Sequence, residues 1–166
     1  MIKNSMLRQL LFLVIPLLIN SWALFGQTHQ GSASADSDSI IVLKTSNEFL
    51  HVFANLEWDQ FTGYFAEDAT AFFPPSAKFP YRANNKTEIE AIFRTVFENA
   101  HKRRTNAPYL DIEPIEIRIQ VSGPVAIETF TLNDPELLGR RTLVWMKKND
   151  QWKIIHLHAS GAAIPK

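Results

Sequence analysis

Residues 141–160 read RTLVWMKKNDQWKIIHLHAS, in which two strand-like runs flank Asn149 and Asp150. Asparagine and aspartate tolerate the backbone angles of a two-residue turn, and such a pair between two runs of this kind is typical of a β-hairpin. The sequence therefore predicts strands over 140–148 and 152–160, joined by a turn at 149–150.

A two-residue turn also fixes which residues face each other across the hairpin. The expected pairs are Lys147 with Trp152, Trp145 with Ile154, Leu143 with His156, and Arg141 with His158. Side chains alternate along a strand, so all of these would lie on one face of the sheet. We therefore expect a surface that combines an arginine, two histidines and two tryptophans, which suits a pocket or an interface better than an ordinary core.

Further strands precede the hairpin. Segment 115–121, IEIRIQV, alternates apolar and polar residues, as a half-exposed strand does. A Gly-Pro turn at 123–124 leads into a strand over 125–132. A short strand over 70–73 is ended by the prolines at 74–75, because proline lacks the N–H group that a sheet requires.

The rest of the domain is predicted to be helical. Apolar residues recur at helical spacing over 40–56 and 58–65, which indicates two consecutive helices bent near Asn55. A longer helix should begin at Asn85, which can cap it together with Glu88. Its apolar stripe comprises Ile89, Ile92, Phe93, Val96, Phe97 and Ala100. This order of elements predicts an α+β fold, with a mostly antiparallel sheet covered on one side by helices.

The N-terminus has the pattern of a secretory signal peptide: two cations, no acid, and an apolar run from 10 to 19. That run is shorter than the roughly 20 residues of a membrane-spanning helix. We expect a signal peptide over 1–26, cleaved near 23–26 or alternatively near 35, a disordered spacer over 27–39, and a domain over 40–162. The mature protein would be periplasmic or secreted and free of the membrane, the alternative being an uncleaved anchor.

Composition narrows the classes of partner. The 166 residues include no cysteine, and 17 basic side chains balance 17 acidic ones. Neutrality gives no electrostatic basis for binding nucleic acid, and a chain without cysteine cannot depend on disulfides. His156 and His158 could ligate a metal, but no third ligand is evident, so we expect neither metal nor cofactor. Ser160 lacks the nucleophile elbow of many hydrolases. A small molecule is the expected ligand.

Two stretches carry a family resemblance. They are LEWDQF at 56–61, continuing to YFAEDAT at 64–70, and RTLVW at 141–145 with WKIIHLHAS at 152–160. Together they resemble the SnoaL-like branch of the nuclear transport factor 2-like superfamily, which also includes ketosteroid isomerases and kinase association domains. The resemblance spans about residues 40–160. It implies a cone-shaped fold in which a curved, mostly antiparallel sheet wraps a long helix and leaves a cavity, and it implies dimerisation through the sheet.

The resemblance does not extend to steroid isomerase chemistry. The position of the isomerases' carboxylate base corresponds to Phe73, which cannot abstract a proton. Their oxyanion-binding tyrosine and protonated aspartate correspond to Phe49 and Leu143. Arg141, His156 and His158 remain as the candidate catalytic residues.

The sequence therefore predicts an exported domain that binds a small, mostly apolar molecule in the cone. The expected ligand-binding residues are Tyr64, Phe73, Phe79, Tyr81, Glu128 and Trp145, with Arg141 and His158 as polar contacts. One alternative is an isomerase, cyclase or dehydratase that uses His158 as acid or base and Arg141 to stabilise negative charge. Another is a homo-oligomeric association module without a ligand.

Overall fold

The structure, a computed structural model, describes the backbone of residues 30–74, 82–133 and 137–163. By its internal contacts the chain divides into two units, 1–34 and 35–166, and the second unit carries the fold. The predicted signal peptide and the predicted pocket residues Phe79 and Tyr81 lie outside the described residues. Within the described part, no helix is both long and apolar enough to cross a membrane.

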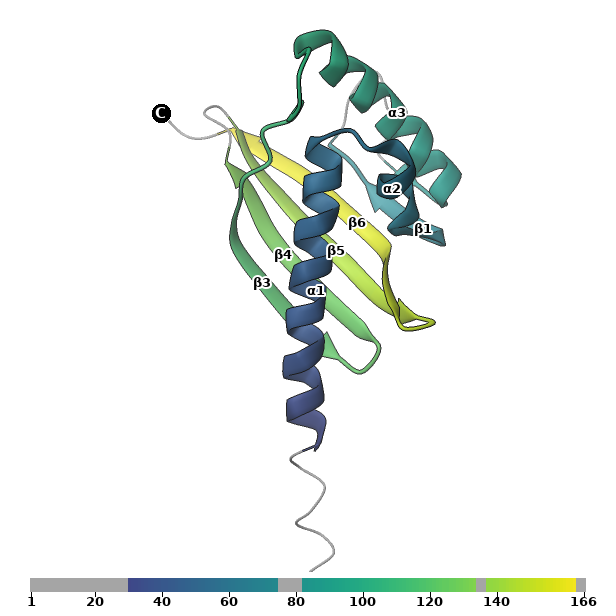
Figure 1. The fold of residues 1–166 in the computed structure, drawn as a ribbon, viewed down its shortest axis with the longest axis vertical. Coiled ribbons are helices and arrows are strands. Elements are labelled where there is room, and N and C mark those ends of the chain that lie inside the picture. Colours follow the sequence, from purple (N-terminus) through teal and green to yellow (C-terminus); the bar gives the residue numbers. More distant parts are fainter. Residues whose placement is uncertain (1–29, 75–81, 134–136, 164–166) are drawn as a thin grey trace, which may run out of the picture. The chain divides into compact units, whose positions relative to one another are not determined.

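The described residues form three helices and one six-stranded sheet (Figure 1). The helices are α1 (Gln30–Ala54), α2 (Trp58–Gly63) and α3 (Lys86–Arg103). The strands are β1 (Phe65–Phe72), β2 (Arg82–Ala83), β3 (Pro114–Ser122), β4 (Val125–Asn133), β5 (Leu137–Lys148) and β6 (Gln151–Ala163). The strand order is β2-β1-β6-β5-β4-β3, and within this sheet only β1 and β6 run parallel. The predicted α+β class with a mostly antiparallel sheet is confirmed.

Some element boundaries differ from the prediction. Helix α1 begins at Gln30, so the prediction of a disordered spacer does not hold for residues 30–39. Asp38 lies in this part of α1 and forms an ion pair with Lys147 of β5 at 3.0 Å, which ties the helix to the sheet. Strand β1 begins earlier than predicted because the carbonyl of Tyr64 already accepts a hydrogen bond from the backbone of β6.

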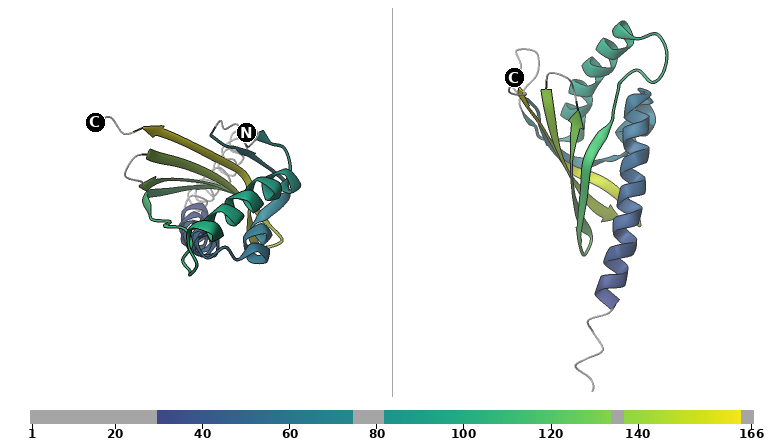
Figure 2. Two further views of the ribbon diagram at one scale, coloured as in Figure 1. Left: turned by 90° about the horizontal axis from the view of Figure 1, so that it is seen from above. Right: turned by 90° about the vertical axis from the view of Figure 1, so that its left-hand side faces the viewer.

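The helices lie on one face of the sheet, as predicted, and the other face carries no helix of the described part (Figures 1 and 2). Phe49 of α1 packs edge-on against Trp145 of β5, with ring centroids 6.2 Å apart. Helix α3 begins where the sequence predicts: the Asn85 side chain accepts a hydrogen bond from the backbone N–H of Glu88 at 2.9 Å. Its buried stripe packs toward β1. We call the helix-covered side the inner face and the opposite side the outer face.

Candidate functional site

The hairpin between β5 and β6 turns where the sequence predicts, but its pairing changes beyond Trp145. Asn149 and Asp150 have φ values of 50° and 59°, and Trp145 pairs with Ile154 as expected. The register then shifts, so that Val144 faces His156, which leaves Ile155 as an extra residue on β6. Such a β-bulge changes which side chains point to each face of the sheet.

The bulge separates the predicted polar cluster into two. Arg141 pairs with Ala159, and Thr142, on the other side of β5, pairs with His158. Leu157 and Ala159 are buried on the inner face, so the alternating residues His156 and His158 lie on the outer face. The prediction that both histidines share a face with Arg141 is therefore wrong.

A cavity of about 200 Å³ lies on the inner face, between the helices and the sheet. Its walls are mostly aromatic and aliphatic and include Phe49, Phe53, Phe73, Phe93, Phe130 and Leu157. The prediction for Phe73 agrees with this position. The other four phenylalanines were not predicted to line a pocket. Three of them, Phe49, Phe53 and Phe93, lie in helices, and helical spacing alone does not distinguish a cavity wall from a filled core. We call this cavity the inner pocket.

Arg141 is the only charged side chain among the described residues that line the inner pocket. Its Nη1 donates hydrogen bonds to the carbonyl oxygens of Arg140 at 2.8 Å and Ser160 at 3.1 Å. Burial lowers the pKa of Arg141 from its ordinary value, yet an arginine in a protein keeps its charge at neutral pH. The pocket thus combines an apolar interior with one cation.

Glu128 is also on the inner face but does not line the pocket. Its side chain is fully buried, and its two oxygens accept hydrogen bonds from Ser46 Oγ at 2.6 Å and from Trp145 Nε1 at 2.8 Å. Burial raises the pKa of Glu128, and the two hydrogen bonds oppose that increase. Glu128 and Trp145 therefore connect α1 with β4 and β5, and their predicted place in the pocket wall is wrong.

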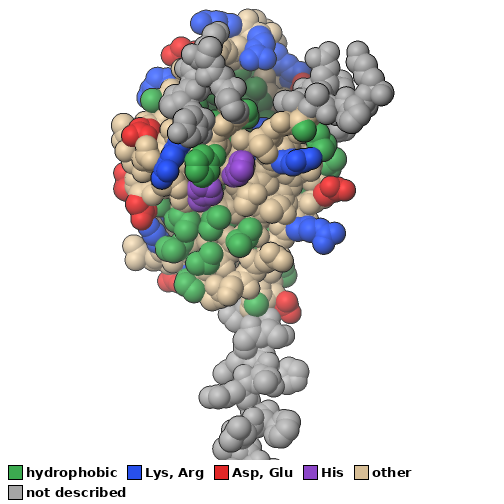
Figure 3. Space-filling view, turned by 180° about the vertical axis from the view of Figure 1, so that it is seen from behind, with side chains coloured by type: hydrophobic (Ala, Val, Ile, Leu, Met, Phe, Trp, Pro, Cys, Tyr) green, Lys and Arg blue, Asp and Glu red, His purple; other side chains and the backbone are tan. Residues whose placement is uncertain are grey.

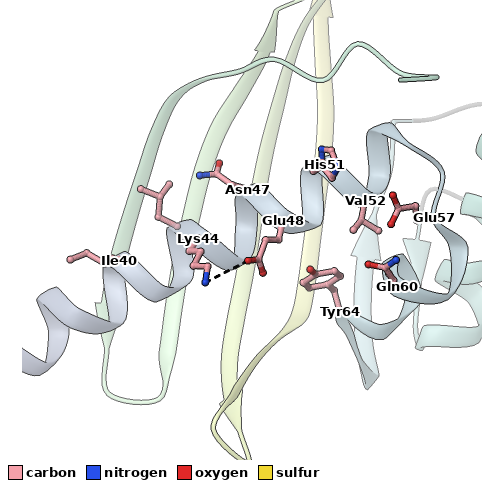
Figure 4. Close-up of a pocket in the computed structure, with 10 residues that line it drawn as sticks. Ile40, Lys44, Asn47, Glu48, His51, Val52, Glu57, Gln60 and Tyr64 are labelled. Carbon is pink, nitrogen blue, oxygen red and sulfur yellow. Dashed lines mark ion pairs between the residues drawn. The ribbon is translucent and has the colours of Figure 1, made fainter. Parts of the chain in front are cut away.

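Tyr64 was predicted to line the inner pocket and instead lines a groove of about 770 Å³ between α1 and α2 (Figure 4). Burial, and then the charges of Glu48 and Glu57, raise the pKa of Tyr64. Lys44 already pairs with Glu48 across 3.8 Å, and both side chains are largely exposed. The inner pocket is less open than this groove and has mostly apolar walls, so it is the better candidate for holding an apolar ligand.

The two histidines belong to a different surface, on the outer face. His156 Nδ1 and Thr70 Oγ1 share a hydrogen bond of 2.8 Å, and the Phe72 ring packs edge-on against both imidazoles. Burial, followed by the charges of His158 and Arg82, lowers the pKa of His156. In Figure 3 the histidines lie above a group of apolar side chains on this face. Among the described residues, no three acidic or histidine side chains gather as metal ligands.

Fold and site together define a small α+β domain with a mostly apolar pocket between its helices and its sheet. The family model described as a SnoaL-like domain matches residues 42–165. The chain therefore belongs to the SnoaL-like domain family, as the sequence resemblance indicates. A search among curated proteins finds no match.

Solved structures share the fold at low sequence identity. A proposed dehydratase of the NTF2-like family from Streptomyces avermitilis is 18% identical with a TM-score of 0.64, over 76% of this chain and 97% of that one. A proposed ketosteroid isomerase from Parabacteroides distasonis is 19% identical with a TM-score of 0.55, over 75% and 87%. The CaMKII association domain of C. elegans is 13% identical with a TM-score of 0.54, over 76% and 98%. These likenesses show the NTF2-like fold.

Proposed function

We propose that the protein binds a small, mostly apolar molecule in the inner pocket. The observation that carries the proposal is a cavity with phenylalanine walls in which Arg141 is the only polar side chain among the described lining residues. Pockets that hold ligands have this composition, apolar walls with a few polar contacts. Its volume of about 200 Å³ is below the roughly 300–1,000 Å³ of sites for drug-sized ligands, so the ligand is small.

Binding is favoured over acid–base catalysis by the groups around the pocket. No carboxylate or imidazole occurs among the described residues that line it. An acid or base must lie within hydrogen-bond reach of the atom that it protonates or deprotonates. His158 lies on the opposite face of β6, which weakens the alternative of an isomerase, cyclase or dehydratase that uses this residue.

Filling the pocket tests the proposal. Ala159 lines the cavity and is almost fully buried, so Ala159→Leu should occupy part of the space without adding a polar group. With octan-1-ol as an apolar probe, calorimetric titration should show an affinity lower by roughly tenfold or more, since lost contact area weakens apolar binding. Gln60→Leu, which alters the α1–α2 groove instead, should leave the affinity unchanged. Equal effects of both variants, or no octanol binding to the natural protein, would contradict the proposal.

We also propose that a second copy of the chain covers the outer face. Phe72 and Ile127 are exposed there at 37% and 42%, and Figure 3 shows apolar side chains gathered on this face, as is typical of an interface. The described part of the chain provides no element over this face. A symmetric pair of apolar sheet faces would bury these residues in both copies.

Sedimentation velocity tests the dimer. Ile127→Glu would place a charge in the proposed interface and should shift the protein from dimer to monomer. Ile40→Glu on α1 is the matched control, because Ile40 is 70% exposed on the helical side, and it should leave the dimer intact. A natural protein that sediments as a monomer at micromolar concentration would refute this proposal and leave the pocket proposal standing.

A further inference from the structure

The hydrogen bonds of Arg141 to described residues leave one edge of its guanidinium group without an acceptor among those residues. Nη1 has two N–H groups and donates to two carbonyl oxygens, of Arg140 and Ser160. Nε and Nη2 have no hydrogen-bond acceptor among the described residues. The edge formed by these two nitrogens is the one that can hold a carboxylate through two parallel hydrogen bonds.

Arg141 also lacks a counter-charge within the described part of the chain. No described acidic side chain lies within ion-pair distance of it. Removing a cation from water is costly unless an anion or hydrogen bonds compensate it, and an ion pair is stronger beside apolar walls than in water. The direction of the Arg141 pKa, lowered by burial, agrees with an uncompensated charge.

Gly139 gives the guanidinium group the space that it occupies. A Cβ atom at residue 139 would lie 3.3 Å from Nη1 and 3.5 Å from Nη2 of Arg141. The backbone angle of Gly139 is not in the left-handed region, so the effect of a larger residue there is steric: the guanidinium group would have to shift by a few tenths of an ångström. A glycine inside a strand weakens it and often marks the close approach of another group. Here that group is Arg141, whose side chain lies back along β5.

We infer that the ligand of the inner pocket is a small amphipathic carboxylic acid, whose carboxylate pairs with Arg141 and whose apolar body lies among the phenylalanine rings, with Gly139 as the positioning residue for Arg141. This inference rests on the proposed function of the pocket. The one cation among the described lining residues suits a single negative charge, and the small volume of the cavity suits a short alkyl or single-ring acid.

The test compares two probes of equal chain length, octanoate and octan-1-ol, by calorimetric titration at neutral pH. Octanoate should bind the natural protein roughly 10- to 100-fold more tightly, the range expected for charge-assisted hydrogen bonds. Arg141→Gln should remove this preference, so that octanoate and octanol bind the variant with affinities equal to within about threefold. Gly139→Ala retains the charge but shifts it by a few tenths of an ångström, and should reduce the preference for octanoate less than Arg141→Gln does.

The outcomes separate this inference from the proposal on which it rests. If octanol binds and octanoate binds no more tightly, the acid class is overturned while the pocket stands. If neither probe binds, both proposals fail. If octanoate is preferred but Arg141→Gln and Gly139→Ala leave that preference intact, the carboxylate is recognised elsewhere and the role of Arg141 is refuted. A thermal unfolding curve for each variant shows whether the fold is retained.

Discussion

Glu128→Ala is expected to lower the free energy of unfolding by roughly 3–5 kcal/mol, from two lost hydrogen bonds and a new cavity in the core. The substitution leaves the Ser46 hydroxyl and the Trp145 N–H buried without their acceptor. These residues belong to α1 and β5, so the loss also loosens the helix from the sheet. Urea unfolding at neutral pH measures the effect.

Glu128→Gln is the matched control and carries a pH dependence of its own. Burial raises the pKa of Glu128 in the folded protein, so the folded state binds this proton more tightly than the unfolded state does. This tighter proton binding stabilises the folded protein at pH values below the ordinary pKa of a glutamate. The stabilisation is lost as the pH rises through the pKa of Glu128 in the folded state. The glutamine variant lacks this loss. Its stability relative to the natural protein should therefore increase from pH 4 to pH 8.

A stability difference between Glu128→Gln and the natural protein that does not change with pH would contradict this reasoning. The same variant also separates a structural role from a binding role. Because Glu128 does not line the inner pocket, Glu128→Gln should bind octanol as the natural protein does.

Local features of the sequence predicted most of the elements. Asn149-Asp150 identified the last hairpin, and Asn85 with Glu88 identified the start of α3, because turns and caps depend on a few neighbouring residues. Alternation of apolar and polar residues identified the strand over 115–121, which forms most of β3. Short elements were less predictable. The two residues of β2 show no periodic pattern, and their strand is defined only by pairing with Ala71 and Phe72 of β1.

The candidate site was less predictable, because one β-bulge in β6 determines which side chains point to the inner face. Residues up to Ile154 follow the predicted facing, and those after Ile155 follow the opposite one. The sequence did contain a signal of the bulge. Apolar Leu157 and Ala159 alternate with polar His156 and His158, so Leu157 and Ala159 suit the inner face. Ile154 suits that face as well, and both can hold only if the alternation shifts at the adjacent isoleucines 154 and 155. The sequence could not predict that the side chain of Glu128 points to the inner face, because its hydrogen-bond partner Ser46 is 82 residues away.

Phe61→Ala is expected to have the other large effect, a loss of roughly 3–5 kcal/mol, which is the usual range for truncating a buried phenylalanine. Phe61 is fully buried and its ring lies within 5.5 Å, between centroids, of five others. Those rings belong to Phe49, Phe53, Phe65, Phe93 and Phe97. The residue thus connects α1, α2, α3 and β1 at one point.

Phe72→Ala on the outer face is the matched control, since Phe72 is 37% exposed and should lose much less stability on truncation. Equal losses for the two variants in urea unfolding would refute the central role of Phe61.

Phe49, Phe53 and Phe93 also form part of the pocket wall, so they link this core to binding. Phe61 supports these walls from behind without lining the cavity. Octanol affinity should therefore fall in Phe61→Ala even under conditions where the variant is fully folded, because the rings that shape the pocket lose their common support.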